Sequence, residues 1–155
     1  MTRINKKKAE ELGLLPSPGK EESRLKPSTS AVIILPGRPI TKKNSQRIIF
    51  NKATGRRMVI QSKKYLQYEK ECLWQLKQYR DKHIGPVQVT ARYWMPDRRS
   101  WPDLMGLLQA TCDILERAGI IENDKNVVRL DGSEIVGVDR ENPRVEVEVI
   151  ARPES

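Results

Sequence analysis

Residues 93–128 have the sequence YWMPDRRSWPDLMGLLQATCDILERAGIIENDKNVV. An apolar strand gives way to a basic loop, Asp103 follows, and a segment with apolar residues three and four positions apart leads to Gly119. Asp is a favoured N-cap residue, and Gly favours the position just after the last helical turn. A second acidic group, Glu122 and Asp124, lies where the next strand is expected to begin. We therefore expect a strand–helix–strand unit with carboxylates at both ends of the helix.

The segments on either side of this unit complete an α/β (α+β) fold. Residues 87–95 alternate between apolar and polar side chains, which predicts a half-buried strand. Residues 62–83 predict a helix, because apolar side chains recur there at spacings of three and four: Tyr65, Tyr68, Cys72, Leu76 and Tyr79. Further strands are expected in AVIILP, in RIIF and RMVI joined as a hairpin by NKATGR, and in the closing RVEVEVI. This order predicts a small mixed β-sheet with two main helices packed on it.

The composition indicates one domain and a polyanionic partner. The 155 residues include 29 Lys and Arg against 20 Asp and Glu, for a formal charge of +9. Such a surplus favours nucleic acid, although charge alone does not separate DNA, RNA and a membrane surface. Residues 1–30, rich in Lys, Glu, Ser and Pro, predict a disordered basic tail before a domain at 31–152. That tail is either a solvated leader or an arm that lies along the nucleic acid.

The remaining composition favours the cytoplasm and no membrane partner. No apolar run approaches the roughly 20 residues of a membrane span. The N-terminal sequence MTRINKKKAEELG lacks the apolar core of a secretory signal. Cys72 and Cys112 each lie in an apolar helical context, which favours buried free thiols over a disulfide or a metal pair.

Basic side chains concentrate in the predicted hairpin and beside the two helices. Clustering in one supersecondary unit favours phosphate contacts, which position DNA without specifying its sequence. The alternative is a solvated charged face. We expect the DNA-binding set to be Lys42, Lys43, Asn44, Arg47, Arg56, Arg57, Lys63, Lys64, Arg98 and Arg99.

The two acidic ends of the 104–118 helix are candidates for a metal site. A helix of this length can return the chain to the sheet, so that Asp103 and Asp124 meet over one surface. Oxygen-only clusters of this kind suit Mg²⁺, which is held by a few carboxylates, water and substrate phosphate oxygens. The alternative is structural: Asp103 serves as an N-cap, and Glu122 and Asp124 form a solvated turn.

The order and spacing of several segments resemble the RusA family of Holliday-junction resolvases, small endonucleases of bacteria and their phages. The resemblance covers approximately residues 31–150. It is carried by MPDRR at 95–99, PDL at 102–104, LLQATCDILERAGIIENDKNVV at 107–128, and the upstream GRPITKKNS and SKKYLQYEKECLWQL.

The resemblance implies a homodimer that binds a four-way DNA junction and cuts two strands symmetrically during recombination and repair. It implies Mg²⁺, with Mn²⁺ as a substitute, held by Asp103 and Asp124. The family pattern is not complete: its second aspartate falls on Met105, its asparagine on Gly106, its helix lysine on Gln109 and its first turn acid on Asn123.

Two hypotheses follow from the missing aspartate. In the first, the chain is an Mg²⁺-dependent endonuclease in which another carboxylate completes the site. Glu122, Asp131 and Asp97 lie in loops that could bring a carboxylate to it. Alternatively, the chain is a non-catalytic recombination accessory protein that binds branched DNA on the same fold. A third interpretation, an RNA-binding domain, has only the charge in its favour.

Overall fold

The computed structural model describes residues 31–42 and 46–152. The expected disordered tail at 1–30 lies outside these residues, as do Lys43 and Asn44. The elements are β1 (Ile33–Pro36), β2 (Gln46–Asn51), β3 (Arg56–Gln61), α2 (Lys63–Leu76), β4 (Val87–Met95), α3 (Leu104–Arg117), the 3₁₀ helix η2 (Asp124–Asn126), β5 (Val127–Arg129), β6 (Glu134–Val138) and β7 (Arg144–Ala151). A mixed sheet with two helices is the predicted α/β architecture, so the fold prediction is confirmed.

Strand β4 is the centre of the main sheet, whose order is β1-β7-β4-β5. β7 pairs antiparallel with both β1 and β4. On its other edge, β4 pairs parallel with β5 near its start and with β6 near its end. A parallel neighbour requires a crossover connection, which α3 provides between β4 and β5. α3 therefore follows β4 and leads, through η2, to the strand that pairs with the start of β4.

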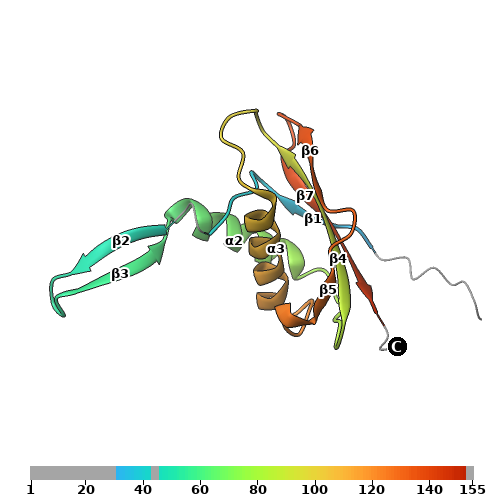
Figure 1. Cartoon of the computed structure of the whole chain (residues 1–155), viewed down its shortest axis with the longest axis horizontal. Helices are drawn as coiled ribbons and strands as arrows, with labels where there is room; N and C mark the ends of the chain where they lie inside the picture. Colours follow the sequence, from blue (N-terminus) through green and yellow to red (C-terminus); the bar gives the residue numbers. More distant parts are fainter. Residues whose placement is uncertain (1–30, 43–45, 153–155) are drawn as a thin grey trace, which may run out of the picture.

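Both helices cover one face of this sheet (Figure 1). The alternation predicted for β4 is confirmed, because Val87, Val89, Ala91, Tyr93 and Met95 are fully buried. The facing side of α3 buries five apolar residues, Leu107, Leu108, Ala110, Ile114 and Leu115, and also Thr111. A buried hydrogen bond of 2.7 Å joins the Tyr93 hydroxyl to the Thr111 hydroxyl, so the helix and the strand hold each other in one register.

The hairpin of β2 and β3 forms a separate two-stranded sheet that projects away from the body (Figure 1). We call residues 46–61 the arm. The predicted turn at 51–56 is present, with Gly55 at φ +66°. Unlike the main sheet, the arm leaves its large apolar side chains exposed: Ile48, Ile49, Phe50, Met58, Val59 and Ile60.

The first helix is shorter than the sequence predicts. Ser62 caps α2 by accepting from the Tyr65 N–H, but the helix ends at Leu76 and does not continue to residue 83. The His83 N–H donates to the Ile120 carbonyl at 2.8 Å, and His83 forms an isolated bridge with Ile121. This long-range pairing replaces the last helical turns. Within the described part of the chain, no helix is long and apolar enough to cross a membrane.

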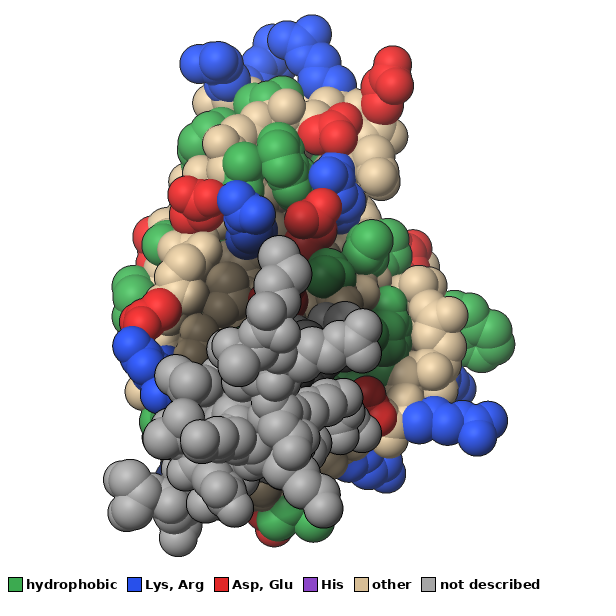
Figure 2. Space-filling model, turned by 90° about the vertical axis from the view of Figure 1, so that its right-hand side faces the viewer, with side chains coloured by type: hydrophobic (Ala, Val, Ile, Leu, Met, Phe, Trp, Pro, Cys, Tyr) green, Lys and Arg blue, Asp and Glu red, His purple; other side chains and the backbone are tan. Residues whose placement is uncertain are grey.

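The side of the molecule opposite the arm carries charges of both signs. Where described residues form this side, Lys and Arg side chains alternate with Asp and Glu (Figure 2). Several are paired: Arg92 lies 3.2 Å from Glu134, and Arg144 contacts Asp139 and Glu146 at 2.8 and 3.0 Å. A surface of paired charges offers little net attraction to a polyanion.

The two cysteines are buried and free, as the sequence predicts. Burial raises the pKa of the Cys72 thiol to about 12 and that of Cys112 to about 11. At pH 8 the thiolate fraction of each is therefore about 0.1% or less. We expect no reaction of the native protein with a thiol reagent within minutes at pH 8, and two reactive thiols per chain in guanidinium chloride. Rapid labelling of native protein would contradict the burial of these helix faces.

Candidate functional site

A pocket of about 720 Å³ lies beside α3. Its wall includes residues from three separate segments: Lys42 from the loop after β1, Asp103 and Gln109 from the start and middle of the α3 region, and Asp124 from η2. Met105, which stands where the resembling family has an aspartate, also lines the pocket and is 70% exposed. Asp103 and Asp124 therefore share one cavity.

Asp103 is the N-cap of α3, as its position in the sequence predicts. Its backbone is extended, with φ −70° and ψ 145°, and its Oδ2 accepts from the Gly106 N–H at 2.9 Å. This hydrogen bond satisfies one of the donors that every helix N-terminus leaves without an intrahelical partner. Within the described residues, Oδ1 makes no hydrogen bond, so one oxygen of this exposed carboxylate remains available to the pocket.

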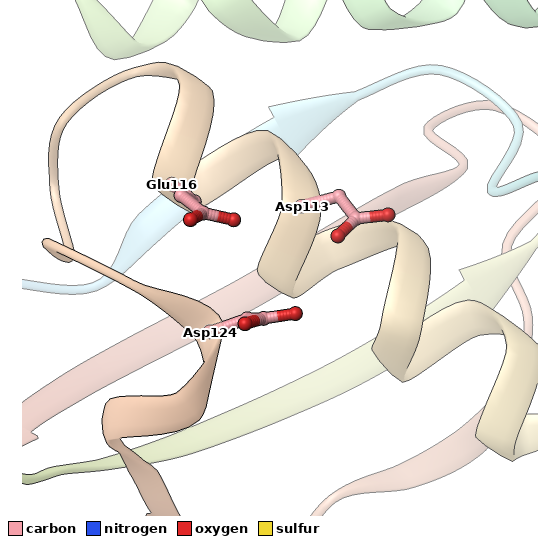
Figure 3. A group of neighbouring side chains, drawn as sticks. All are labelled: Asp113, Glu116 and Asp124. Carbon is pink, nitrogen blue, oxygen red and sulfur yellow. The ribbon is translucent and has the colours of Figure 1, made fainter.

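Three other carboxylates converge near the far end of the same helix. Oxygens of Asp113, Glu116 and Asp124 all lie within 4.8 Å of one another. Asp113 and Glu116 are three positions apart on α3 and so share a face, while Asp124 comes from η2 across a short gap (Figure 3). Asn123 shapes η2 by accepting from the Lys125 N–H at 2.9 Å. Asp124 is thus held opposite the helix pair.

This group differs from the one expected from sequence. A rise of about 1.5 Å per residue separates positions 103 and 113 by about 15 Å along the helix, and Asp103 is not part of the group. Glu122 and Asp131 are also outside it, and Asp131 instead pairs with Arg129 at 2.6 Å. Asp97 accepts from the Arg99 N–H at 2.8 Å.

Sequence reasoning missed Asp113 and Glu116 as members of a carboxylate group. Asp113 also has a basic partner, because Lys42 Nζ lies 3.0 Å from Asp113 Oδ2. The signal in the sequence was an acidic pair three residues apart in a helix that ends shortly before an acidic turn. That signal is weak alone, because acidic pairs of this spacing are common on solvated helix faces.

The predicted DNA-binding residues that the structure describes lie in four places. Lys42 lines the pocket, Lys63 and Lys64 form the first turn of α2, and Arg98 and Arg99 lie in the loop before α3. The arm carries the others that are described, Arg47, Arg56 and Arg57. Within the described residues, no carboxylate lies within 4.0 Å of Lys63, Lys64 or these three arginines.

The two lysines of α2 stand at the unfavourable end of the helix. The helix dipole places a partial positive charge at an N-terminus, so two lysines in the first turn repel it and lower helix stability slightly. An anion at this position relieves the repulsion and accepts hydrogen bonds from the free N–H groups. The start of α2 therefore favours contact with a phosphate.

Comparison with known proteins assigns the family. The model of the family described as Endodeoxyribonuclease RusA matches residues 36–150, which is most of the chain. The chain therefore belongs to the RusA endodeoxyribonuclease family, whose members are nucleases acting on Holliday junctions and generally depend on divalent metal ions. A search of curated proteins finds no significant match.

Two substitutions of Asp103 test its role as the N-cap of α3. Asp103→Ala removes the capping acceptor and should lower the free energy of unfolding by about 1 kcal/mol. Asp103→Asn keeps an oxygen that can accept from the Gly106 N–H and should stay within a few tenths of a kcal/mol of the wild type. Equilibrium urea unfolding measures both. Equal losses in the two variants would show that the cap is not the source of the stabilisation.

Proposed function

We propose that this chain is a divalent-metal-dependent endonuclease that resolves four-way DNA junctions in recombination and repair in the cytoplasm. One observation carries the proposal: in a RusA-family chain with a formal charge of +9, three carboxylates converge beside a pocket that also holds Asp103. Such a convergence of like charges is unfavourable, and within the described residues only Asp113 of the three has an ion-pair partner, Lys42.

The donor set fits a hard divalent cation. Asp113, Glu116 and Asp124 offer only oxygen ligands, which suit Mg²⁺ and its substitute Mn²⁺. We assign Asp124, with Asp113 and Glu116, to hold the ion. When bound, the metal would polarise a phosphate oxygen and lower the pKa of an attacking water molecule. Glu122 and Asp131 have no part in this assignment.

The protein's own groups have separate tasks in the reaction. Asp103 Oδ1, outside the capping hydrogen bond, can accept a hydrogen bond from a water molecule or ion in the pocket. Attack of water on phosphorus breaks the bond to the 3′-oxygen and leaves a ligatable 5′-phosphate. Because Asp103 and Asp124 line one pocket beside α3, we place the scissile phosphate in that pocket.

Contacts with the sugar-phosphate backbone hold the junction in place. The start of α2 supplies Lys63 and Lys64, and the loop before α3 supplies Arg98 and Arg99. The arm supplies Arg47, Arg56 and Arg57, to which we add Lys43 and Asn44 from the adjoining sequence. Such contacts carry no sequence information, which suits a nuclease that selects DNA by shape.

We also propose that the functional unit is a homodimer and that the arm is part of its interface. Register places Ile49, Met58 and Ile60 on one face of the arm, and Ile48, Phe50 and Val59 on the other. An isolated two-stranded hairpin is marginal in water, and an apolar surface on both faces requires cover on both. A second copy provides cover, and it also provides the second active site for the second strand.

Met105 favours a second candidate function, a non-catalytic protein that binds branched DNA. Its exposed thioether lies on the pocket wall where a further carboxylate would strengthen metal binding. In this alternative the carboxylate group is a solvated acidic face, and only the shape and the basic residues retain a role.

Cleavage of a synthetic four-way junction tests the proposed activity. We expect paired symmetric nicks with Mg²⁺ or Mn²⁺, and a loss of about a hundredfold or more in rate for Asp124→Asn and Glu116→Gln, because each removes a ligand charge. Calorimetric titration with Mn²⁺ should show a matching loss of metal binding. Glu141→Gln, which removes an equal charge from an exposed loop, is the control and should match the wild type.

The same experiment identifies the alternative. Tight junction binding without cleavage in either metal, together with no Mn²⁺ binding by the wild type, would replace the nuclease by the non-catalytic binder. Preference for single-stranded RNA over the junction in competition would replace both by an RNA-binding protein.

The arm prediction concerns oligomeric state. The double substitution Ile48→Glu and Val59→Glu places two charges on one apolar face of the arm and should convert a dimer into a monomer. Size-exclusion chromatography with light scattering measures this, and Ala53→Glu with Thr54→Glu, at the turn of the same hairpin, is the control. A monomeric wild type at micromolar concentration would contradict the proposal.

A further inference from the structure

One basic side chain enters the acidic pocket. Of the described residues that line it, only Lys42 carries a positive charge, whereas Asp103 and Asp124 line it with negative charges. Gln109, on the same wall, is neutral. A DNA phosphate that enters this pocket therefore meets carboxylates with a single protein cation to offset them.

Two groups hold the Lys42 ammonium in position. Nζ lies 3.0 Å from Asp113 Oδ2 and 5.9 Å from the centroid of the Tyr65 ring. The carboxylate and the ring face both attract a cation. The lysine side chain is nonetheless 34% exposed. Because an ammonium has three N–H donors, this one can contact Asp113 and still donate to a ligand in the pocket.

The loop that carries Lys42 is seated directly on the first turn of α3. A Cβ atom at Gly106 would lie 3.0 Å from Thr41 Cγ2, which is tighter than nine in ten real contacts of a Cβ atom. Glycine at this position therefore permits the loop to pack against the helix beside Asp103. The same close packing places the next residue, Lys42, on the wall of the pocket, where its ammonium reaches Asp113 of α3.

We propose that Lys42 is a phosphate-contacting residue of the active site: its Nζ donates to a non-bridging oxygen of the scissile phosphate, while Asp113 and the Tyr65 ring keep it in place. The contact offsets charge on that oxygen as the pentacovalent state forms. This inference rests on the proposed function, because it requires a phosphodiester in the pocket. Asp113 then has two partners, the proposed metal and this ammonium, and it positions Lys42.

Equilibrium binding to a four-way junction tests this contact without any need for cleavage. Anisotropy titrations in Ca²⁺ at several salt concentrations compare the wild type, Lys42→Ala and the control Lys70→Ala. Lys70 lies on the exposed side of α2, outside the pocket. A lost phosphate contact lowers the slope of log K against log salt by about one and weakens binding by about tenfold. We expect this for Lys42→Ala and no change for Lys70→Ala.

A second-site variant distinguishes a charge in the pocket from a structural ion pair. Gln109→Lys in the Lys42→Ala background returns a cation to the same wall from a different element. If Lys42 contacts phosphate, this double variant should recover most of the salt slope and most of the cleavage rate lost in Lys42→Ala. A structural ion pair predicts instead that Lys42→Ala and Asp113→Asn lower the unfolding midpoint equally, with unchanged salt slopes and no rescue, and that result would overturn the inference.

The failure of this inference is separable from the failure of the proposed function. If the wild type cleaves junctions and needs Asp124, but Lys42→Ala matches it in slope and rate, only the role of Lys42 is rejected. If no protein cleaves, the nuclease proposal fails, and the salt slopes still decide whether Lys42 contacts a phosphate.

Discussion

The packing of α3 against β4 determines where every candidate site residue lies. β4 contributes a fully buried face, and the Tyr93–Thr111 hydrogen bond fixes the register between strand and helix. β4 also pairs with β5, to which α3 leads through the turn at Asp124. A loss of this packing would release both walls of the pocket at once. The apolar side of α3 thus positions the carboxylates on its polar side.

Helix geometry then separates the acidic residues into two places. Asp103 begins α3 and serves as its cap, whereas Asp113 and Glu116 lie some three turns later and meet Asp124. The two ends of a rigid helix cannot approach one another, so a site that uses both must extend along the helix. The pocket of about 720 Å³ beside α3 is lined by both Asp103 and Asp124.

The arm and the body satisfy opposite physical requirements. In the body, alternation along β4 and β7 produces one buried apolar face and one face of paired charges. In the arm, apolar residues occupy both faces and remain exposed, with arginines interspersed. Exposed apolar surface of this kind is unfavourable in water, which is the basis of the proposed dimer. The connection between the two parts passes through Lys42 and its neighbours, so the pocket lies where the arm joins the body.

The sequence by itself determined most of the secondary structure, the buried faces and the ends of α3 at Asp103 and Gly119, because these depend on local periodicity and on the conformational preferences of single residues. It also carried the family assignment, through the order of its segments. It did not determine the end of α2, where pairing of His83 with Ile121 overrides helix propensity. Nor did it show that Asp113 and Glu116, rather than Asp103, face Asp124, or that Lys42 contacts Asp113. Those facts depend on distances between segments remote along the chain, which only the packing of α3, η2 and the loop after β1 decides.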